Sequence, residues 1–290
     1  MSPRDASGTI VFTDLDGTLL DYDGYTWAPA GSAVRELLRC GGSIVFCSSK
    51  TLAEQHVYRR DLGIRDPMIV EDGSAVVIPR GYFPERVDLG VQPWGRAGNC
   101  DILVLGVRRH LVLERLRELR ETERIALRGY SDMTSKEVQE MTGLDEGAAG
   151  RAGTRDFSET VHVEGGAGEW RRLMGALEMR GLHTFGCGPT GTVVGLGADK
   201  GRAVELLASL YGRAAAGRGA GRTPPLTVGI GDAANDVPML RAVDRAFLVE
   251  KPAGGWADVE VEGLERVKGV GPVGWSRAVT GLLAAQGLLP

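Results

Sequence analysis

Short apolar runs alternate with amphipathic stretches along the N-terminal part of the chain. The runs at 9–14, 43–49 and 67–79 are rich in β-branched residues, which is typical of buried strands. The stretches at 28–42 and 51–63 look helical, since the first ends at a pair of glycines and the second opens with a threonine cap. Strands that alternate with helices at this spacing predict an α/β fold with a doubly wound, Rossmann-like sheet that is mostly parallel.

The pattern changes in the middle of the chain, where residues 80–100 are rich in glycine and proline. Helices and strands then follow in a different order, which is typical of an α+β unit. We expect strands at 100–107 and 154–165, a hairpin at 183–197, and helices at 108–121, 135–153 and 168–181.

The strand–helix alternation of the core resumes at about residue 198. The expected elements are a helix at 199–212, a strand at 226–232, a helix at 235–243 and a strand at 245–250. The low-complexity segment 212–225 predicts an exposed loop. We therefore predict a core domain formed by 1–83 and 189–290, with an inserted cap domain at 84–188. The candidate hinges between them are 80–98 and 185–191.

Composition excludes several classes of protein. The net charge of -4 and the pI near 5.7 provide no basic surface, so no nucleic acid partner is expected. The polar N-terminus lacks a signal-peptide pattern, and no apolar run reaches the length of about 20 residues that a membrane helix needs. The four cysteines form no CxxC pair, which favours free thiols. We expect a cytoplasmic protein without a membrane partner; the sequence does not determine its oligomeric state.

Two carboxylates end the first predicted strand. Asp14 and Asp16 follow the run at 9–13 and are one residue apart. Their mutual repulsion raises the pKa of one of them, and a divalent cation relieves it. Because Mg²⁺ prefers oxygen ligands and binds beside substrate phosphates, this pair predicts a magnesium site.

Polar residues also stand at the ends of other core strands, and open α/β sheets bind ligands just beyond those ends. Ser48, with Ser49 and Lys50 next to it, ends the second strand at a helix N-terminus, where a phosphate oxygen can be bound. Lys200 lies at a predicted helix start, an unfavourable place for a cation unless it faces an anion.

The strand at 226–231 ends in a fourth polar group. Asp232 and Asp236 can complete a metal site, and Asn235 either contributes to binding or caps the helix that follows. Each of these features also has a structural explanation, as a polar loop, a helix cap or a surface lysine. Their joint occurrence at strand ends favours the functional one.

In this order, DLDGTL (14–19), SSK (48–50), DKG (199–201) and GDAAND (231–236) resemble the motifs of the haloacid dehalogenase-like (HAD) phosphohydrolase superfamily. The resemblance covers the core, and the insert resembles the large α/β cap of one subgroup. It implies that Asp14 is the nucleophile that forms an aspartyl-phosphate, and that Asp16 is the general acid and base. It also implies that Ser48 and Lys200 hold the phosphoryl oxygens.

The same resemblance assigns the Mg²⁺ ligands. The ion would bind the carboxylate of Asp14, the backbone carbonyl of Asp16 and the carboxylate of Asp232. Asp236 would act from outside, through water or through Lys200. Asn235 would support the contact between Ser48 and the phosphate.

Other stretches resemble the mannosyl-3-phosphoglycerate phosphatase branch. They are CSSKT (47–51), IVEDGSAVVIPRGYF (69–83), MTGLDEGAAGRAGTRDFSET (141–160) and DKGRAV (199–204). The resemblance implies a small phosphorylated sugar-glycerate as substrate. Lys50 and Arg155 could meet its carboxylate, and Ser158 and Glu159 its hydroxyls.

The chain departs from this branch at two places, since Asp72 stands where asparagine is usual and an expected sugar contact is absent from 191–201. Three alternatives therefore stay open. They are a phosphatase of another sugar phosphate, a phosphomutase of the same fold, and a non-catalytic module that binds a phosphorylated ligand.

Overall fold

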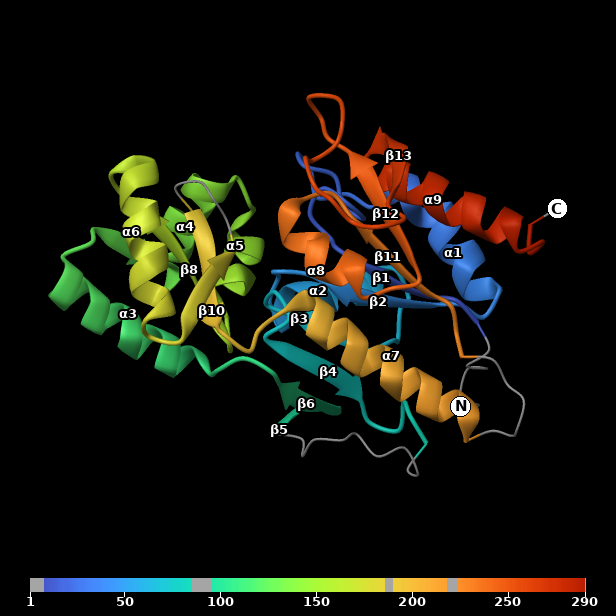
Figure 1. Ribbon diagram of the computed structural model, residues 1–290, viewed down its shortest axis with the longest axis horizontal. Coiled ribbons are helices and arrows are strands. Elements are labelled where there is room, and N and C mark those ends of the chain that lie inside the picture. The colour runs from blue at the N-terminus through green and yellow to red at the C-terminus, as the bar shows by residue number, and fades with distance from the viewer. Residues whose placement is uncertain (1–7, 85–94, 186–189, 218–223, 290) are drawn as a thin grey trace.

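The computed structural model describes residues 8–84, 95–185, 190–217 and 224–289, which form two sheets with helices around each (Figure 1). The larger sheet has nine strands and the smaller has four. The smaller sheet and its helices lie to one side of the larger sheet, as the green and yellow part of Figure 1 shows. This arrangement confirms the predicted α/β core with an α+β cap.

The nine-stranded sheet is the framework of the core. Its strands run parallel from β13 to β3, and β4, β6 and β5 then pair antiparallel. In spatial order the strands are β13 (Glu265–Val270), β12 (Arg245–Glu250), β11 (Thr227–Gly231), β1 (Ile10–Thr13), β2 (Ser43–Cys47), β3 (Met68–Val70), β4 (Ala75–Pro79), β6 (Cys100–Val104) and β5 (Gly95–Ala97).

Helices cover both faces of this sheet because the strand residues are apolar on both faces. In β1, Ile10 and Phe12 belong to the cluster that includes α7 and α8, whereas Val11 belongs to the cluster that includes α1 and α9. The core helices are α1 (Gly31–Arg39), α2 (Leu52–Asp61), α7 (Lys200–Ala216), α8 (Val237–Arg241) and α9 (Pro272–Ala285). Short 3-10 turns precede α1 (Ala28–Ala30) and α8 (Ala234–Asp236).

The cap is an antiparallel sheet with helices packed on it. Its own apolar cluster joins side chains of α3 and α6 to the sheet, for example Leu116 and Trp170 against Val161. The strands, in spatial order, are β7 (Leu127–Gly129), β8 (Ser158–Val163), β10 (Thr190–Gly195) and β9 (Leu182–Phe185). The helices are α3 (Arg109–Glu123), α4 (Ser135–Thr142), α5 (Glu146–Gly153) and α6 (Gly166–Glu178), with a 3-10 turn at Tyr130–Asp132.

The pairing of the strands into two sheets indicates other domain boundaries than those expected from the sequence. β6 and β5 fall within the expected cap range of 84–188, but they pair with β4 of the core. β10 falls within the expected core, but it pairs with β8 and β9 of the cap. We therefore propose that the chain enters the cap near residue 105 and leaves it near residue 197. The two connecting segments, rather than 80–98 and 185–191, become the candidate hinges; residues 85–94 and 186–189 of those ranges lie outside the described part.

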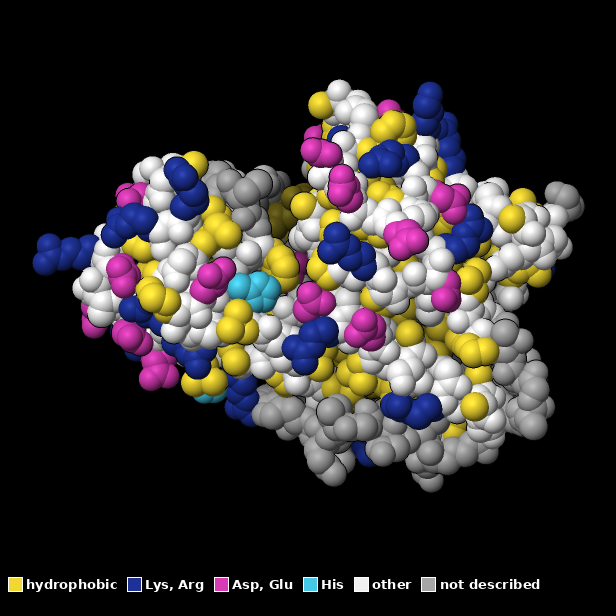
Figure 2. Space-filling view, viewed as in Figure 1, with side chains coloured by type: hydrophobic (Ala, Val, Ile, Leu, Met, Phe, Trp, Pro, Cys, Tyr) yellow, Lys and Arg dark blue, Asp and Glu magenta, His cyan; other side chains and the backbone are white. Residues whose placement is uncertain are grey.

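Several other expectations can be compared with the structure. The prediction of a loop at 212–225 is wrong for its first residues, because α7 continues to Ala216; residues 218–223 lie outside the described part. Cys40, Cys47 and Cys100 are free thiols, as expected. Among the described helices, none combines the length and apolar content needed to cross a bilayer. Lys, Arg, Asp and Glu side chains are interspersed on the face shown in Figure 2.

Candidate active site

The predicted polar residues meet because four neighbouring strands end at the same edge of the sheet. The order β11-β1-β2-β3 places Asp232, Asp14, Ser48 and Glu71 directly after adjacent parallel strands. Ligands of open α/β sheets bind at this edge. Of these residues the sequence singled out Asp232, Asp14 and Ser48, and the structure brings them to one edge of the sheet; Glu71 was not predicted.

Asp14 is held rigidly beside Lys200. The backbone N–H of Asp14 donates to the Ile230 carbonyl at 3.0 Å, which continues the pairing of β1 with β11. Its Oδ1 is 2.9 Å from the Lys200 Nζ, and both side chains are buried. Lys200 is the first residue of α7, as predicted, and Asp199 caps that helix by accepting from the N–H of Arg202. The cation at this helix start thus faces an anion.

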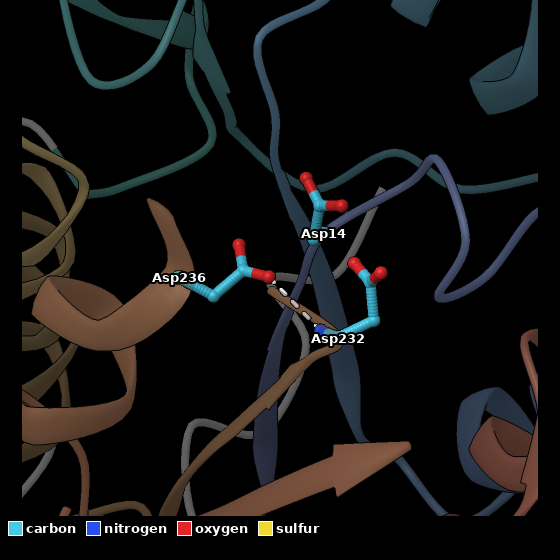
Figure 3. A group of neighbouring side chains, drawn as sticks. All are labelled: Asp14, Asp232 and Asp236. Atoms are coloured by element: carbon cyan, nitrogen blue, oxygen red, sulfur yellow. Dashed lines mark hydrogen bonds between the residues drawn. The ribbon is translucent and has the colours of Figure 1, made fainter. Parts of the chain in front are cut away.

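Asp236 and Asp232 complete a buried carboxylate group with Asp14 (Figure 3). Asp236 Oδ1 accepts from the Lys200 Nζ at 2.8 Å, and its Oδ2 accepts from the backbone N–H groups of Asp232 and Ala233. Gly231 permits this approach, because a Cβ there would lie 2.6 Å from the Asp236 carboxyl group. Both oxygens of Asp236 therefore accept hydrogen bonds from the protein. The same is true of Asp232, whose oxygens accept from the side chains of Thr18, Tyr22 and Lys251.

These residues fit a magnesium ion. Asp14, Asp232 and Asp236 each offer an oxygen, and these atoms lie within 4.8 Å of one another in a buried site. Hard carboxylate oxygens are the ligands that Mg²⁺ prefers. Following the family resemblance, we propose Asp14 and Asp232 as the direct carboxylate ligands. An ion bound there would take the place of the contacts that Tyr22 and Lys251 make with Asp232.

The electrostatics of the site make Asp14 and Asp16 hard to ionise without a further cation. Burial raises the pKa of Asp14 well above its usual range, and Lys200 only partly opposes this, since Asp236 and Asp232 add repulsion. Burial also raises the pKa of Asp16, although the nearby Lys50 ammonium opposes this effect and the Asp16 side chain is 39% exposed. For Lys200, burial lowers the pKa, but Asp14 and Asp236 outweigh it and hold that pKa well above normal.

The Lys50 ammonium lies among the carboxylates of Asp16 and Glu54 and the ring of Tyr25. Its Nζ is 3.0 Å from Asp16 Oδ1 and 3.5 Å from Glu54 Oε1, and it lies 4.8 Å from the centre of the Tyr25 ring. Burial lowers the pKa of Lys50, but the two carboxylates reverse the direction and raise it. The structure thus places Lys50 against the predicted general acid rather than in open space.

The loop after β2 is fixed by the turn after β3. The N–H of Asp72 donates to the Ser48 carbonyl at 3.0 Å, and the Ser48 hydroxyl accepts from the N–H of Lys50 at 3.3 Å. Ser48 is fully buried and Ser49 half-buried. Asn235 is half-buried, and its side chain hydrogen-bonds Asp72, which lowers the pKa of that carboxyl against the larger effect of burial.

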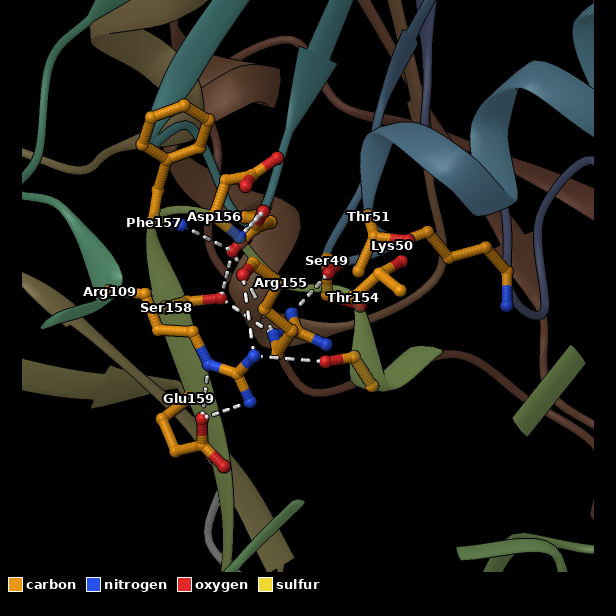
Figure 4. Close-up of polar contacts among 12 residues, drawn as sticks. Ser49, Lys50, Thr51, Arg109, Thr154, Arg155, Asp156, Phe157, Ser158 and Glu159 are labelled. Atoms are coloured by element: carbon orange, nitrogen blue, oxygen red, sulfur yellow. Dashed lines mark hydrogen bonds and ion pairs between the residues drawn. The ribbon is translucent and has the colours of Figure 1, made fainter. Parts of the chain in front are cut away.

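The cap residues predicted to contact substrate are engaged with protein (Figure 4). Arg155 donates from Nε to the Ser158 hydroxyl at 2.7 Å and from its Nη2 to the carbonyl of Ser49 at 2.6 Å. Glu159 is fully buried and pairs with Arg109 at 2.7 Å, while its second oxygen accepts from the N–H of Ser131. Arg155 thus reaches the core loop beside Ser48, whereas Glu159 lies within the cap.

Sequence reasoning missed three residues at the carboxylate group. The first is Thr18, whose hydroxyl donates to Asp232 Oδ1 at 3.2 Å. The Lys251 Nζ lies 2.5 Å from Asp232 Oδ2, and the Tyr22 hydroxyl donates to the same oxygen. Burial raises the pKa of the Tyr22 hydroxyl, and its bond to Asp232 adds to that effect. Lysine is rare in this chain, so Lys251, directly after β12, could have been found by the same strand-end argument as the others.

Comparison with known proteins agrees with this geometry. A family model described as haloacid dehalogenase-like hydrolase matches residues 11–83. A glucosyl-3-phosphoglycerate/mannosyl-3-phosphoglycerate phosphatase of Methanococcoides burtonii is 32% identical over 275 residues, which cover 94% of this chain and 97% of the relative. A mannosyl-3-phosphoglycerate phosphatase of Pyrococcus furiosus is 36% identical over 242 residues, covering 83% and 90%.

The fold is also found in solved structures. A phosphatase of the haloalkanoate superfamily from Bacteroides thetaiotaomicron superposes with a TM-score of 0.63 at 17% identity. The match covers 100% of this chain and 99% of the other. At this identity the likeness concerns the fold alone, and it extends over both the core and the cap.

Proposed function

The chain belongs to the haloacid dehalogenase-like hydrolases and is a phosphoric monoester hydrolase, and from this premise we propose that its substrate is a glycosyl-3-phosphoglycerate. Curated relatives that match over most of the chain carry the names of mannosyl- and glucosyl-3-phosphoglycerate phosphatases. The observation that carries the reaction type is the buried Asp14–Lys200–Asp236 contact beside Asp232, at the strand ends of an open α/β sheet.

In the proposed reaction Asp14 attacks phosphorus and forms an aspartyl-phosphate, which water then hydrolyses. Asp16 donates a proton to the leaving glycerate oxygen and later accepts one from the attacking water. The raised pKa of Asp16 supports this role, because the side chain must carry a proton when the ester bond breaks. Lys50, which lies 3.0 Å from Asp16, would orient that carboxyl group.

Other side chains would bind and neutralise the phosphoryl group. Ser48 would donate its hydroxyl to one oxygen, and Lys200 would hold another while remaining in contact with Asp14. Mg²⁺, bound through Asp14, the Asp16 carbonyl and Asp232, would supply positive charge where negative charge accumulates. Asp236 would hold Lys200 in place, and Asn235 would steady the turn at Asp72.

The cap would supply the contacts to the rest of the substrate. Arg155 is the cap side chain that reaches the core loop, through the Ser49 carbonyl, so its guanidinium would meet the glycerate carboxylate near the phosphate. Ser158 lies beside it and would bind a hydroxyl. Glu159 would act indirectly, because its carboxylate already pairs with Arg109.

The first test measures inorganic phosphate released from mannosyl- and glucosyl-3-phosphoglycerate and from a panel of other sugar phosphates, with Mg²⁺ present. We expect the glycosyl-3-phosphoglycerates to have the highest kcat/KM. Asp14→Asn should lower kcat by about 10⁴-fold or more while leaving the circular dichroism spectrum unchanged, because it removes the nucleophile. The matched control is Asp23→Asn in the same loop, where the side chain is exposed and activity should be retained.

The outcomes separate the alternatives. Isomer formation without phosphate release would show a phosphomutase. Mg²⁺-independent ligand binding without turnover of any ester would show a binding module. Full turnover by Asp14→Asn would exclude the nucleophile assignment, and preference for another sugar phosphate would exclude the substrate assignment alone.

A further inference from the structure

The segment Arg155–Ser158 of the cap is embedded in the core. Phe157 is 2% exposed, and its ring packs with side chains of the core sheet rather than with the cap. Its partners in that cluster are Met68, Val70, Ala75, Val77, Cys100 and Ile102. A single aromatic side chain from the cap therefore fills an apolar site on β3, β4 and β6.

One core carboxylate receives the backbone of the same segment. Glu71 Oε1 accepts from the N–H of Asp156 at 2.9 Å, and its Oε2 accepts from the N–H of Phe157 at 3.0 Å. The Ser158 hydroxyl also donates to Oε2, and the Arg155 Nε lies 3.8 Å from it. Glu71 is fully buried, and all of these donors belong to the cap segment, whose residues Arg155 to Ser158 are labelled in Figure 4.

The backbone of Glu71 is tied to the catalytic loop. Its N–H donates to the Lys50 carbonyl at 3.2 Å, and the next N–H, that of Asp72, donates to the Ser48 carbonyl. Glu71 and Asp72 have φ values of 51° and 56°, which side-chain-bearing residues rarely adopt. Both residues lie in the short loop of the β3–β4 hairpin, where positive φ values are common, and this loop conformation directs their N–H groups to the carbonyls of Lys50 and Ser48.

A second contact links the cap segment directly to the loop that follows β2. The Nη2 of Arg155 donates to the carbonyl of Ser49 at 2.6 Å, so cap residue and core loop touch directly. The Arg155 Nε donates to Ser158, which in turn donates to Glu71. The cap segment is thereby fixed at both ends, on Glu71 and on the loop that holds Ser48.

We propose that Glu71 is a positioning residue that docks the cap segment 155–158 onto the core and so aligns Arg155 with the 48–50 loop for a substrate that extends from the phosphate into the cap. The identity of the substrate in this proposal rests on the proposed function. The docking of the cap segment rests on the contacts of Glu71 described above. It assigns Glu71 no contact with substrate and no part in the chemical step.

The conservative change Glu71→Gln tests this directly. Glutamine has the same shape, but one acceptor oxygen becomes an NH₂ group that faces the N–H donors of the cap. Losing charge-assisted hydrogen bonds of this kind corresponds to roughly tenfold or more in an equilibrium. We expect KM for the glycosyl-3-phosphoglycerate to rise by about tenfold, while kcat/KM for the small ester p-nitrophenyl phosphate changes by less than about twofold, because that ester needs only the core.

Amide hydrogen exchange provides a readout that does not depend on turnover. In Glu71→Gln, peptides that contain the N–H groups of Asp156 and Phe157 should exchange about tenfold faster, with the rest of the cap unchanged. The matched control is Glu169→Gln, which breaks a cap ion pair with Arg172 at the surface and should alter neither readout. Glu71→Asp keeps the charge and should lie between wild type and Glu71→Gln.

Two results would overturn the proposal. One is an equal loss for both substrates, which would indicate a general structural role for Glu71. The other is unchanged exchange at Asp156 and Phe157 together with an unchanged KM. If the wild-type protein fails to hydrolyse glycosyl-3-phosphoglycerates, the proposed function fails, yet the exchange experiment still decides whether Glu71 docks the cap.

Discussion

At the scale of single residues, Asp72 is a carboxylate in a place where its charge is poorly compensated. It is 1% exposed, and its Oδ1 accepts no hydrogen bond from the described part of the chain. That oxygen lies 3.9 Å from the Lys200 Nζ, whereas Asp14 and Asp236 approach the same ammonium to 2.9 and 2.8 Å. Burial accordingly raises the pKa of Asp72, although Lys200 and Arg155 lower it in part.

We predict that Asp72→Asn stabilises the protein at pH 8 by about 1 kcal/mol, the usual scale for a buried acceptor without a partner. The folded-state pKa of Asp72 is raised, so its contribution to stability is fully present below the unfolded pKa near 3.8 and is lost as the pH rises through the folded value. The gain should therefore shrink toward pH 4. Urea unfolding of both proteins at pH 4 to 8, without Mg²⁺, measures it.

If the wild-type protein is more stable than Asp72→Asn at pH 8, the attraction between Asp72 and Lys200 outweighs the cost of burying the Asp72 carboxylate.

Single residues also show which part of the site can be predicted from the sequence. Asp14, Ser48, Lys200 and Asp232 were identifiable because each stands next to a recognisable strand or helix. Glu71 and Phe157 were not identified, since their contacts depend on how the cap docks.

At the scale of elements, the turn between β3 and β4 supports α7. Gly73 has a φ of 84°, and a Cβ there would lie 2.3 Å from the backbone carbon of Asp199 and 2.6 Å from the nitrogen of Lys200. The turn therefore sets where the first turn of α7 begins, and with it the position of the Lys200 side chain. Glycine is required here both for the conformation and for the space.

We predict that Gly73→Ala lowers both stability and kcat, whereas Gly63→Ala lowers stability alone. Gly63 also has a left-handed φ, of 67°, but no atom lies within 4 Å of its would-be Cβ. Each variant should lose about 1–2 kcal/mol for the left-handed conformation. Only Gly73→Ala should displace Lys200. Phosphate release from p-nitrophenyl phosphate and thermal unfolding measure the two effects, and equal kcat values for the two variants would contradict this explanation.

The elements also differ in how well the sequence predicts them. The sequence predicted β1, β2 and β11 correctly, because each is a short apolar run and each is fully buried in the sheet. β13 was not predicted, because it is an edge strand whose residues are exposed or half-buried and form no apolar run. β7 has only three residues and one of them is exposed, so it too lacks a local signal.

At the scale of the whole molecule, the two segments that connect core and cap lie against each other. A Cβ on Gly197 would lie 2.0 Å from the Leu105 carbonyl oxygen, and one on Gly195 would lie 2.9 Å from Val107. The N–H groups of Leu105 and Gly106 both donate to the Ser74 carbonyl, which anchors the entering segment to the turn before β4. The orientation of the cap is thus set where the two segments cross as well as at Glu71. The sequence did not predict this contact, because it placed the first segment in a strand at 100–107 and the second in a hairpin at 183–197.

We predict that Gly197→Ala shifts the cap relative to the core. The added methyl group cannot fit against the Leu105 carbonyl, so the segments must separate, at a cost of about 1–3 kcal/mol of stability. KM for a glycosyl-3-phosphoglycerate should rise several-fold more than KM for p-nitrophenyl phosphate, because only the larger substrate bridges both domains. The control is Gly212→Ala in α7, where nothing lies within 4 Å and alanine favours the helix. Parallel changes in both KM values would place the effect of Gly197 in the core, since a shift confined to the cap leaves the phosphate site intact.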